Sequence, residues 1–196
     1  MDHVIAHGGT LLSIPRAEFN RLCLKYGPQL NLEGCTIGLL PSVVKSGSPA
    51  GTAVVADGVI DGVRLLVAMG GRESNFGANL RPRHETAYDI NGRFWRDSSL
   101  LQKYIAEHGW DGACSYGPLQ IMAVNAKDCT PEQLAADADL AMQAAVEFLN
   151  RYVLGHWHAR TLEAICRTYN GGNPRAATTA GYTEEVWQHY LTEVIA

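Results

Sequence analysis

The chain has 196 residues, of which 46% are apolar and 18% charged, so it can build one hydrophobic core and is too apolar for wholesale disorder. Its formal net charge of −4 argues against a nucleic-acid-binding surface and a polybasic membrane patch. No apolar run approaches the roughly 18 residues of a membrane span.

Local signals predict the first elements of a mostly helical chain. Ser13 followed by Pro15 indicates a helix start, and this helix is expected to end at Tyr26. Residues 27–48 lack clear periodicity and are expected to form a surface loop. Ser48-Pro49 would open another helix, which breaks before the next apolar run.

The following helix is the most informative. Asp61 can cap it, and residues 63–69 are apolar apart from Arg64, a pattern typical of a buried helix. The helix is expected to end around Glu73. Residues 77–97 mix Pro, Arg, Asn, Gly and aromatics, which favours a long functional loop or a small β region.

The C-terminal half predicts more helices. Residues 140–153 carry an apolar stripe at helical spacing, and four capping signals mark helix starts: Asp97 or Ser98, the capping box at Thr130, Thr161, and Thr183. The fold class that follows is mainly α (α+β), a single domain with at most a small β region. Residues 1–60 would form a helical and loop extension packed on the same domain as residues 61–196.

The five cysteines are Cys23, Cys35, Cys114, Cys129 and Cys166. Their odd number and the lack of C-x-x-C spacing indicate neither a zinc site nor a full disulfide framework, and reduced thiols are the default expectation. A bridge between Cys23 and Cys35, or between Cys114 and Cys129, stays open.

Other reactive residue types lack a supporting context. His156 and His158 have no third ligand at a recognisable spacing, and Cys114 with His84 or His108 would be a thiol–imidazole pair without a known motif around it. No metal and no cofactor is therefore expected.

Glu73 is the strongest candidate for catalysis. A carboxylate at the C-terminal end of a helix faces the negative end of the helix dipole, and burial also favours its protonated form. A glutamate that is neutral near pH 7 can donate a proton to a leaving group, which glycosidic cleavage requires. On position alone, a frayed helix end with an exposed carboxylate is the more common explanation.

Three short motifs change that balance. They are Glu73-Ser74-Asn75-Phe76, then Ser115-Tyr116-Gly117-Pro118-Leu119-Gln120-Ile121-Met122, then Thr168-Tyr169-Asn170-Gly171-Gly172. In this order they resemble the lysozyme-like superfamily, specifically soluble lytic transglycosylases and goose-type lysozymes. The resemblance runs from about Asp61 to the C-terminus and implies a lysozyme-like fold.

The resemblance implies a role for each matching residue. Glu73 would be the catalytic acid and base, and Ser74 would help to hold the site. Gln120 would line the cleft, where its amide suits N-acetyl groups and hydroxyls. Tyr169 and Asn170 would face the glutamate, with the tyrosine hydroxyl bonding to it.

Tyr182 resembles a tyrosine that opens the last helix and stacks in the cleft. The chain also departs from the family pattern. Thr168 replaces a usual alanine, and Gly70-Gly71 replaces bulkier residues. Tyr169 taken alone also fits a core stripe, and Gln120 a satisfied polar residue at a helix start.

The resemblance implies cleavage of the β-1,4 bond between N-acetylmuramic acid and N-acetylglucosamine in peptidoglycan glycan strands. A hydrolase usually needs a second carboxylate. The candidates Glu85, Asp89, Asp97 and Asp111 all lie in an unmatched insert. A lytic transglycosylase, which forms 1,6-anhydromuramoyl ends, needs one carboxylate and is therefore favoured.

Three alternatives stay open: a hydrolytic lysozyme, a chitinase-type glycanase, and a non-catalytic wall-binding part of a phage tail or secretion machine. The acidic net charge counts mildly against an anionic wall substrate. A monomer is favoured. No signal peptide is visible, so either one has been removed, or the protein is made in the cytoplasm and reaches the wall by another route, such as phage-type release or non-classical export.

Overall fold

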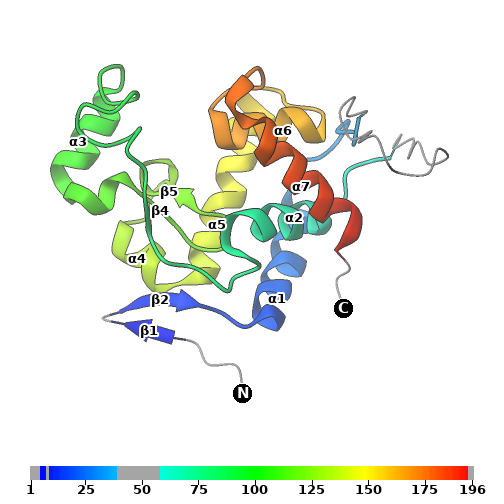
Figure 1. Cartoon of the computed structure of the whole chain (residues 1–196), viewed down its shortest axis with the longest axis horizontal. Coiled ribbons are helices and arrows are strands. Elements are labelled where there is room, and N and C mark those ends of the chain that lie inside the picture. Colours follow the sequence, from blue (N-terminus) through cyan, green and yellow to red (C-terminus); the bar gives the residue numbers. More distant parts are fainter. Residues whose placement is uncertain (1–4, 8, 39–57, 194–196) are drawn as a thin grey trace.

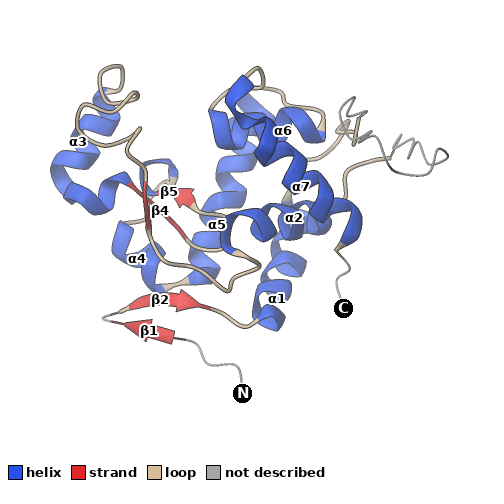
Figure 2. Ribbon diagram, viewed as in Figure 1, coloured by secondary structure: helices blue, strands red, loops and turns tan. Residues whose placement is uncertain are grey.

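The computed structural model describes residues 5–7, 9–38 and 58–193 (Figure 1). Helices dominate, and the strands are short and confined to two small sheets (Figure 2). The prediction of a mainly helical chain with a small β region is confirmed. The predicted helix at Ser48-Pro49 lies outside the described residues.

The N-terminal segment begins with a hairpin that the sequence analysis did not predict. Strands β1 (Ile5–His7) and β2 (Thr10–Ser13) pair antiparallel, followed by helix α1 (Arg16–Tyr26) and the 3-10 turn η1 (Gly27–Gln29). The predicted end of the helix is confirmed. Ser13 does not cap it, because this residue belongs to β2 and Pro15 occupies the position before the helix.

Helix α2 (Gly62–Ser74) is the central element. It begins as predicted, since Asp61 accepts a hydrogen bond from the backbone N–H of Arg64 at 2.8 Å. Its residues from Leu65 to Gly70 are buried, and it packs against α1 and against α7 (Ala180–Thr192). The left-handed backbone of Asn75, at φ 49°, ends the helix.

The two glycines before Glu73 allow aromatic rings to approach this helix. A Cβ on Gly70 would lie 2.4 Å from the ring of Phe19, and a Cβ on Gly71 would lie 2.6 Å from the ring of Phe76. The departure from bulkier residues at these positions therefore has a packing reason, because the two phenylalanine rings occupy the space.

A second sheet follows the loop after α2. Strands β3 (Arg83–His84), β4 (Cys114–Tyr116) and β5 (Ile121–Met122) pair antiparallel, with Arg83 opposite Ser115 and Tyr116 opposite Ile121. The turn between β4 and β5 contains Gly117, at φ +74°, where a Cβ would lie 2.3 Å from that of Ala141. The second sequence motif is thus a tight hairpin.

Capping signals located most of the other helices correctly. Ser98, Thr130 and Thr161 each accept a backbone hydrogen bond at the start of a helix, and Thr130 with Gln133 forms the predicted capping box. The helices are α3 (Ser99–His108), α4 (Pro131–Ala136), α5 (Ala138–Phe148) and α6 (Leu162–Gly171). The 3-10 turns are η2 (Gly109–Ala113), η3 (Ala123–Asn125) and η5 (Ala177–Thr179).

Two helical predictions need correction. The apolar stripe after Leu140 continues past α5 into a π-helix, η4 (Leu149–His156), whose wider turns periodicity alone did not distinguish. The last helix begins at Ala180, a turn before Thr183, whose hydroxyl instead donates to the carbonyl of Thr179 inside the helix.

Two hydrophobic clusters divide the interior. The large one joins side chains from α1, α2, α5, α6 and α7, so the N-terminal helix shares the core of the rest of the chain. A small one, formed by Leu101, Ile105 and Ala113, lies under α3, which projects away from α6 and α7 (Figure 1). The molecule therefore has a main body and a smaller α3 lobe.

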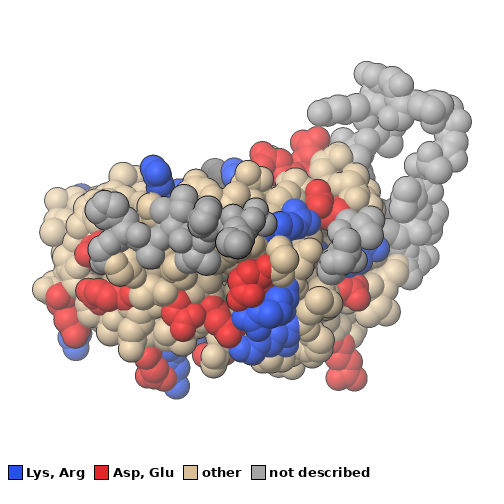
Figure 3. Space-filling view, turned by 90° about the horizontal axis from the view of Figure 1, so that it is seen from below, with Lys and Arg blue, Asp and Glu red and all other residues tan. Residues whose placement is uncertain are grey.

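The charged surface and the state of the cysteines can be compared with what the composition predicted. Acidic and basic side chains are interspersed on the face seen in Figure 3, so this face carries no single-sign field. In the described parts of the chain, no helix has the length and apolarity to cross a membrane. All five cysteines are free thiols, which confirms the default expectation and rules out both bridges in this structure.

Candidate functional site

A cavity of about 570 Å³ lies between the main body and the α3 lobe. Tyr88, Phe94 and Leu101 from the α3 lobe line one side, and Phe148 and Tyr169 from the main body line the other. The lining combines aromatic rings with polar side chains, a composition suited to a sugar, whose faces are apolar and whose edges carry hydroxyls.

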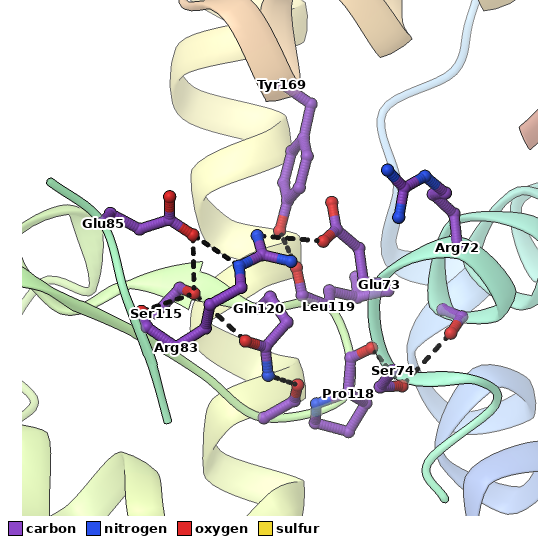
Figure 4. A network of polar contacts seen from close by, with 12 residues as sticks. Arg72, Glu73, Ser74, Arg83, Glu85, Ser115, Pro118, Leu119, Gln120 and Tyr169 are labelled. Carbon is purple, nitrogen blue, oxygen red and sulfur yellow. Dashed lines mark hydrogen bonds and ion pairs between the residues drawn. The ribbon is translucent and has the colours of Figure 1, made fainter. Parts of the chain in front are cut away.

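Glu73 lies in the last turn of α2 and reaches the wall of this cavity. Its side chain is only 4% exposed. The guanidinium of Arg83 contacts it, with Nη2 of the arginine 3.5 Å from Oε2 of the glutamate (Figure 4). A buried carboxyl that borders a cavity can exchange a proton with a bound ligand while it is shielded from bulk water.

The protonation of Glu73 is poised near neutrality. Burial raises the pKa of Glu73 to about 7, which is the largest effect on this group. The positive charges of Arg83 and Arg72 and the hydroxyl of Tyr182 lower the pKa, while the charge of Glu85 raises it. Near pH 7 the carboxyl is therefore present in both forms, as a group serving first as acid and then as base requires.

Ser74 joins the end of α2 to the β4–β5 turn. Its hydroxyl lies 2.8 Å from the carbonyl oxygen of Pro118, to which it can donate, and accepts the backbone N–H of Gly77 at 2.9 Å. Ser74 is buried and does not line the cavity. Its contacts fix the helix end, and hence Glu73, relative to the turn.

Gln120 lines the cavity at the β4–β5 turn, with a left-handed backbone at φ 49°. Its Nε2 donates to the carbonyl of Gly117 at 3.0 Å, and its Oε1 accepts from the hydroxyl of Ser115 at 3.1 Å. The residue lies in a hairpin turn, not at a helix start. Much of its amide hydrogen bonding is used within the protein, so it shapes the wall of the cavity.

Tyr169 lines the cavity from α6, but its hydroxyl does not bond to Glu73 as the sequence analysis expected. It donates to the carbonyl of Leu119 at 2.6 Å (Figure 4). Burial raises the pKa of Tyr169, and the nearby charge of Glu73 raises it further. The tyrosine thus connects α6 to the same turn that carries Gln120.

The remaining two predicted residues, Asn170 and Tyr182, differ in their relation to the cavity. Asn170 is exposed and lines the cavity. Tyr182 is buried in the core and is not part of the cavity lining, so the structure does not place it for stacking on a ligand. Among the described residues its hydroxyl has no partner in good hydrogen-bonding geometry, yet it lies close enough to Glu73 to lower the pKa of that carboxyl.

The structure adds Arg83, which the sequence analysis did not place in the site, and pairs it with Glu85, one of the candidate second carboxylates. Arg83, with its side chain 48% exposed, lies between Glu73 and Glu85, and its Nε is 2.6 Å from Oε1 of Glu85. Arg83 and Glu85 are two residues apart at a short strand, a spacing that puts side chains on one face. The sequence could therefore have predicted that Arg83 and Glu85 lie side by side, but not that this face of the strand meets Glu73.

The four candidate second carboxylates separate into two groups. Glu85 and Asp97 line the cavity, whereas Asp89 and Asp111 are not part of its lining. Asp89 lies 2.9 Å from Nε2 of His84. Of the two that line the cavity, Glu85 is paired with Arg83. Asp97 is the other acidic residue of the lining.

The alternative chemistries have weak support. Burial raises the pKa of Cys114 to about 12, so its reactive thiolate is strongly disfavoured. The imidazole of His84 instead stacks on Trp110, with ring centroids 5.1 Å apart. Within the described ranges there is no group of three or more His, Cys, Asp or Glu side chains that could hold a metal ion.

Comparison with known proteins adds no relative. The sequence matches no protein-family model. No curated protein is similar to it, and no solved structure matches its fold. The resemblance to lysozyme-like enzymes therefore depends on the three sequence motifs.

Proposed function

We propose that this protein cleaves the β-1,4 bond between N-acetylmuramic acid and N-acetylglucosamine in peptidoglycan, on a lysozyme-like fold, as a lytic transglycosylase. The observation that carries the proposal is Glu73, a buried carboxyl with a pKa of about 7 at the wall of a cavity lined by aromatic and polar side chains. The order of the three motifs supports the same assignment.

The proposed reaction uses Glu73 twice. Protonated Glu73 donates its proton to the glycosidic oxygen as the bond to the muramoyl C1 breaks, and the N-acetylglucosamine hydroxyl leaves. The muramoyl 6-hydroxyl then attacks C1, and the Glu73 carboxylate takes the proton of that hydroxyl. A 1,6-anhydro ring forms, and the tethered nucleophile benefits from proximity.

Hydrolysis is the second candidate, because Glu85 and Asp97 also line the cavity. A retaining hydrolase needs a nucleophilic carboxylate about 5 Å from the acid, and an inverting one needs a base roughly 6.5–9.5 Å away. Arg83 engages the carboxylate of Glu85 at 2.6 Å, and this pairing lowers its suitability as a free nucleophile. The transglycosylase is preferred because its reaction needs Glu73 alone and depends on neither Glu85 nor Asp97.

Mass spectrometry of digested peptidoglycan tests the proposal. We expect muropeptides with 1,6-anhydromuramoyl ends, which are lighter than hydrolytic products by one water. Products with only reducing ends would show hydrolysis and direct attention to Glu85 and Asp97. Cleavage of chitin oligomers, which lack the lactyl group, would indicate a chitinase-type glycanase, and no cleavage of either polymer would indicate a wall-binding role.

A further inference from the structure

We propose that Arg83 and Glu85 form a charge pair that acts through Glu73 as a positioning device: Arg83 is the counter-ion of ionised Glu73 between the two half-steps, and Glu85 limits how strongly Arg83 holds it. The inference rests on the proposed function. It concerns residues in the insert that matches no family motif.

The geometry places Arg83 as a bridge. Its Nε lies 2.6 Å from Oε1 of Glu85, whereas its Nη2 lies at the longer distance of 3.5 Å from Oε2 of Glu73 (Figure 4). The planar guanidinium can contact two carboxylates at once. Glu85 is therefore the closer partner of Arg83, and the longer contact with Glu73 leaves room for the guanidinium to move nearer to that carboxyl.

Polar contacts around Ser115 place Glu85 beside the β4–β5 hairpin. The hydroxyl of Ser115 lies 3.1 Å from Oε1 of Gln120 and 3.3 Å from both Oε1 of Glu85 and the carbonyl oxygen of Arg83, and it can donate its single proton to one of these acceptors at a time. Gln120 in turn donates to the carbonyl of Gly117. The pair of Arg83 and Glu85 therefore lies against the β4–β5 hairpin, next to the glutamine of the second motif.

Other charged and titratable groups face Glu73 from every neighbouring element. Arg72 precedes it on α2, Cys166 and Tyr169 lie on α6, and Tyr182 lies on α7. The Arg72 guanidinium is turned to Glu185 on α7, with Nε 2.8 Å from Oε2. Arg83 is thus the cation that contacts the Glu73 carboxyl.

This arrangement suits a carboxyl that must change charge within one turnover. After Glu73 gives up its proton, it carries a negative charge in a buried site, and Arg83 stabilises that state. If Arg83 were free of Glu85, it would hold Glu73 ionised before the reaction, and no proton would be available. Glu85 divides the charge of Arg83 between two carboxylates.

The test measures the pKa of Glu73 in the folded protein without substrate, by an NMR titration that follows the carboxyl carbons. The signal of Glu73 is identified as the one that is lost in Glu73→Gln. We expect Arg83→Gln to raise the pKa of Glu73 above about 7. Glu85→Gln should move the pKa in the opposite direction, toward the ordinary value of a glutamate. In the Arg83→Gln background, Glu85→Gln should have a much smaller effect.

Two control variants accompany this titration. Arg83→Lys keeps the positive charge and should largely restore the Glu73 titration. Arg81→Gln removes the same charge from an exposed residue outside the cavity lining and should leave the titration unchanged. Thermal melting of each variant checks that the fold is intact.

The alkaline limb of the pH–rate profile on purified walls should move with the titrations, because Glu73 must be protonated when the reaction begins, and Arg83→Gln should lower kcat by about 10- to 100-fold. Shifts of both single variants in the same direction, or no shift, would overturn the inference. Complete loss of activity in Glu85→Gln with an unmoved Glu73 titration would do so too, and would identify Glu85 as a directly reacting carboxylate. Correct titrations without wall cleavage would instead contradict the proposed function alone.

Discussion

The two sides of the cavity contribute differently to the same carboxyl. The helical wall consists of Glu73 on α2 and Tyr169 on α6, and Tyr182 of α7 is buried in the core behind them. The strand wall, formed by Arg83, Glu85, Ser115 and Gln120 around β3, β4 and β5, is polar and carries opposite charges. Burial on the helical wall therefore raises the pKa of Glu73, and the charges of Arg83 and Glu85 on the strand wall adjust that pKa.

Each wall has its own energetic basis. On the helical wall, the removal of water from Glu73 raises its pKa, because a charged carboxylate is poorly solvated there. On the strand wall, the half-exposed Arg83 acts in a medium of higher effective dielectric, so its influence is smaller than that of burial. Substitution of Glu73 itself should therefore have a larger effect than any substitution on the strand wall.

Glu73→Gln should have the largest effect and tests whether the helical wall supplies the reacting group. General acid catalysis alone is typically worth 10²–10⁴-fold, and here one carboxyl would serve two steps. We expect turbidity loss of purified cell walls to slow by at least about 10³-fold. Glu107→Gln, an exposed acid at the end of α3, is the matched control and should keep full activity. A Glu73→Gln enzyme with more than about a tenth of the wild-type rate would refute the assignment.

The same variant should change stability in a pH-dependent way. The folded-state pKa of Glu73, about 7, lies above its ordinary value of 4.5, so the native state binds more protons between these values and loses stability as the pH rises. At pH 8 the buried carboxylate should cost on the order of 3 kcal/mol, and at pH 4 nearly nothing. Glu73→Gln should therefore be more stable than the wild type at pH 8.

Urea unfolding at pH 4 and pH 8 measures this difference. At each pH, the free energy of unfolding of the wild type is subtracted from that of Glu73→Gln. The two differences are then compared, because a hydrogen bond lost at both pH values cancels in this comparison. An effect of the substitution that is independent of pH would mean that burial on the helical wall does not shift the titration of Glu73.

The helical wall was also the more predictable from sequence. Its helices begin at residues whose side chains cap their own backbone, such as Asp61 and Thr161, and such contacts span only three residues. The buried face of α2 follows from its apolar run, and the position of Glu73 follows from the end of that helix. These features depend on neighbours in the chain, which sequence patterns report.

The strand wall depends on contacts that are distant in sequence. Arg83 meets Glu73 across a turn of the loop, and Ser115 reaches Glu85 from another strand. Very short strands such as β3 leave almost no alternation to detect. The partner of Tyr169 was wrongly assigned for the same reason, because nothing local indicated that its hydroxyl would bond to Leu119, 50 residues earlier.

Tyr169→Phe should have the smallest of these effects and tests whether the two walls are coupled. The hydroxyl does not contact Glu73, so its removal should not abolish catalysis. It leaves the buried carbonyl of Leu119 without a donor, which typically costs about 1–3 kcal/mol of stability. Since Leu119 precedes Gln120 in the β4–β5 turn, looser packing of the turn should lower turnover several-fold. Tyr104→Phe, which removes a weaker tyrosine–carbonyl bond (3.4 Å) under the α3 lobe, is the control that should lose some stability and no turnover. If Tyr169→Phe loses stability in denaturant unfolding but keeps its full rate, the tyrosine is only a core residue, and the helical wall does not act on catalysis through the turn.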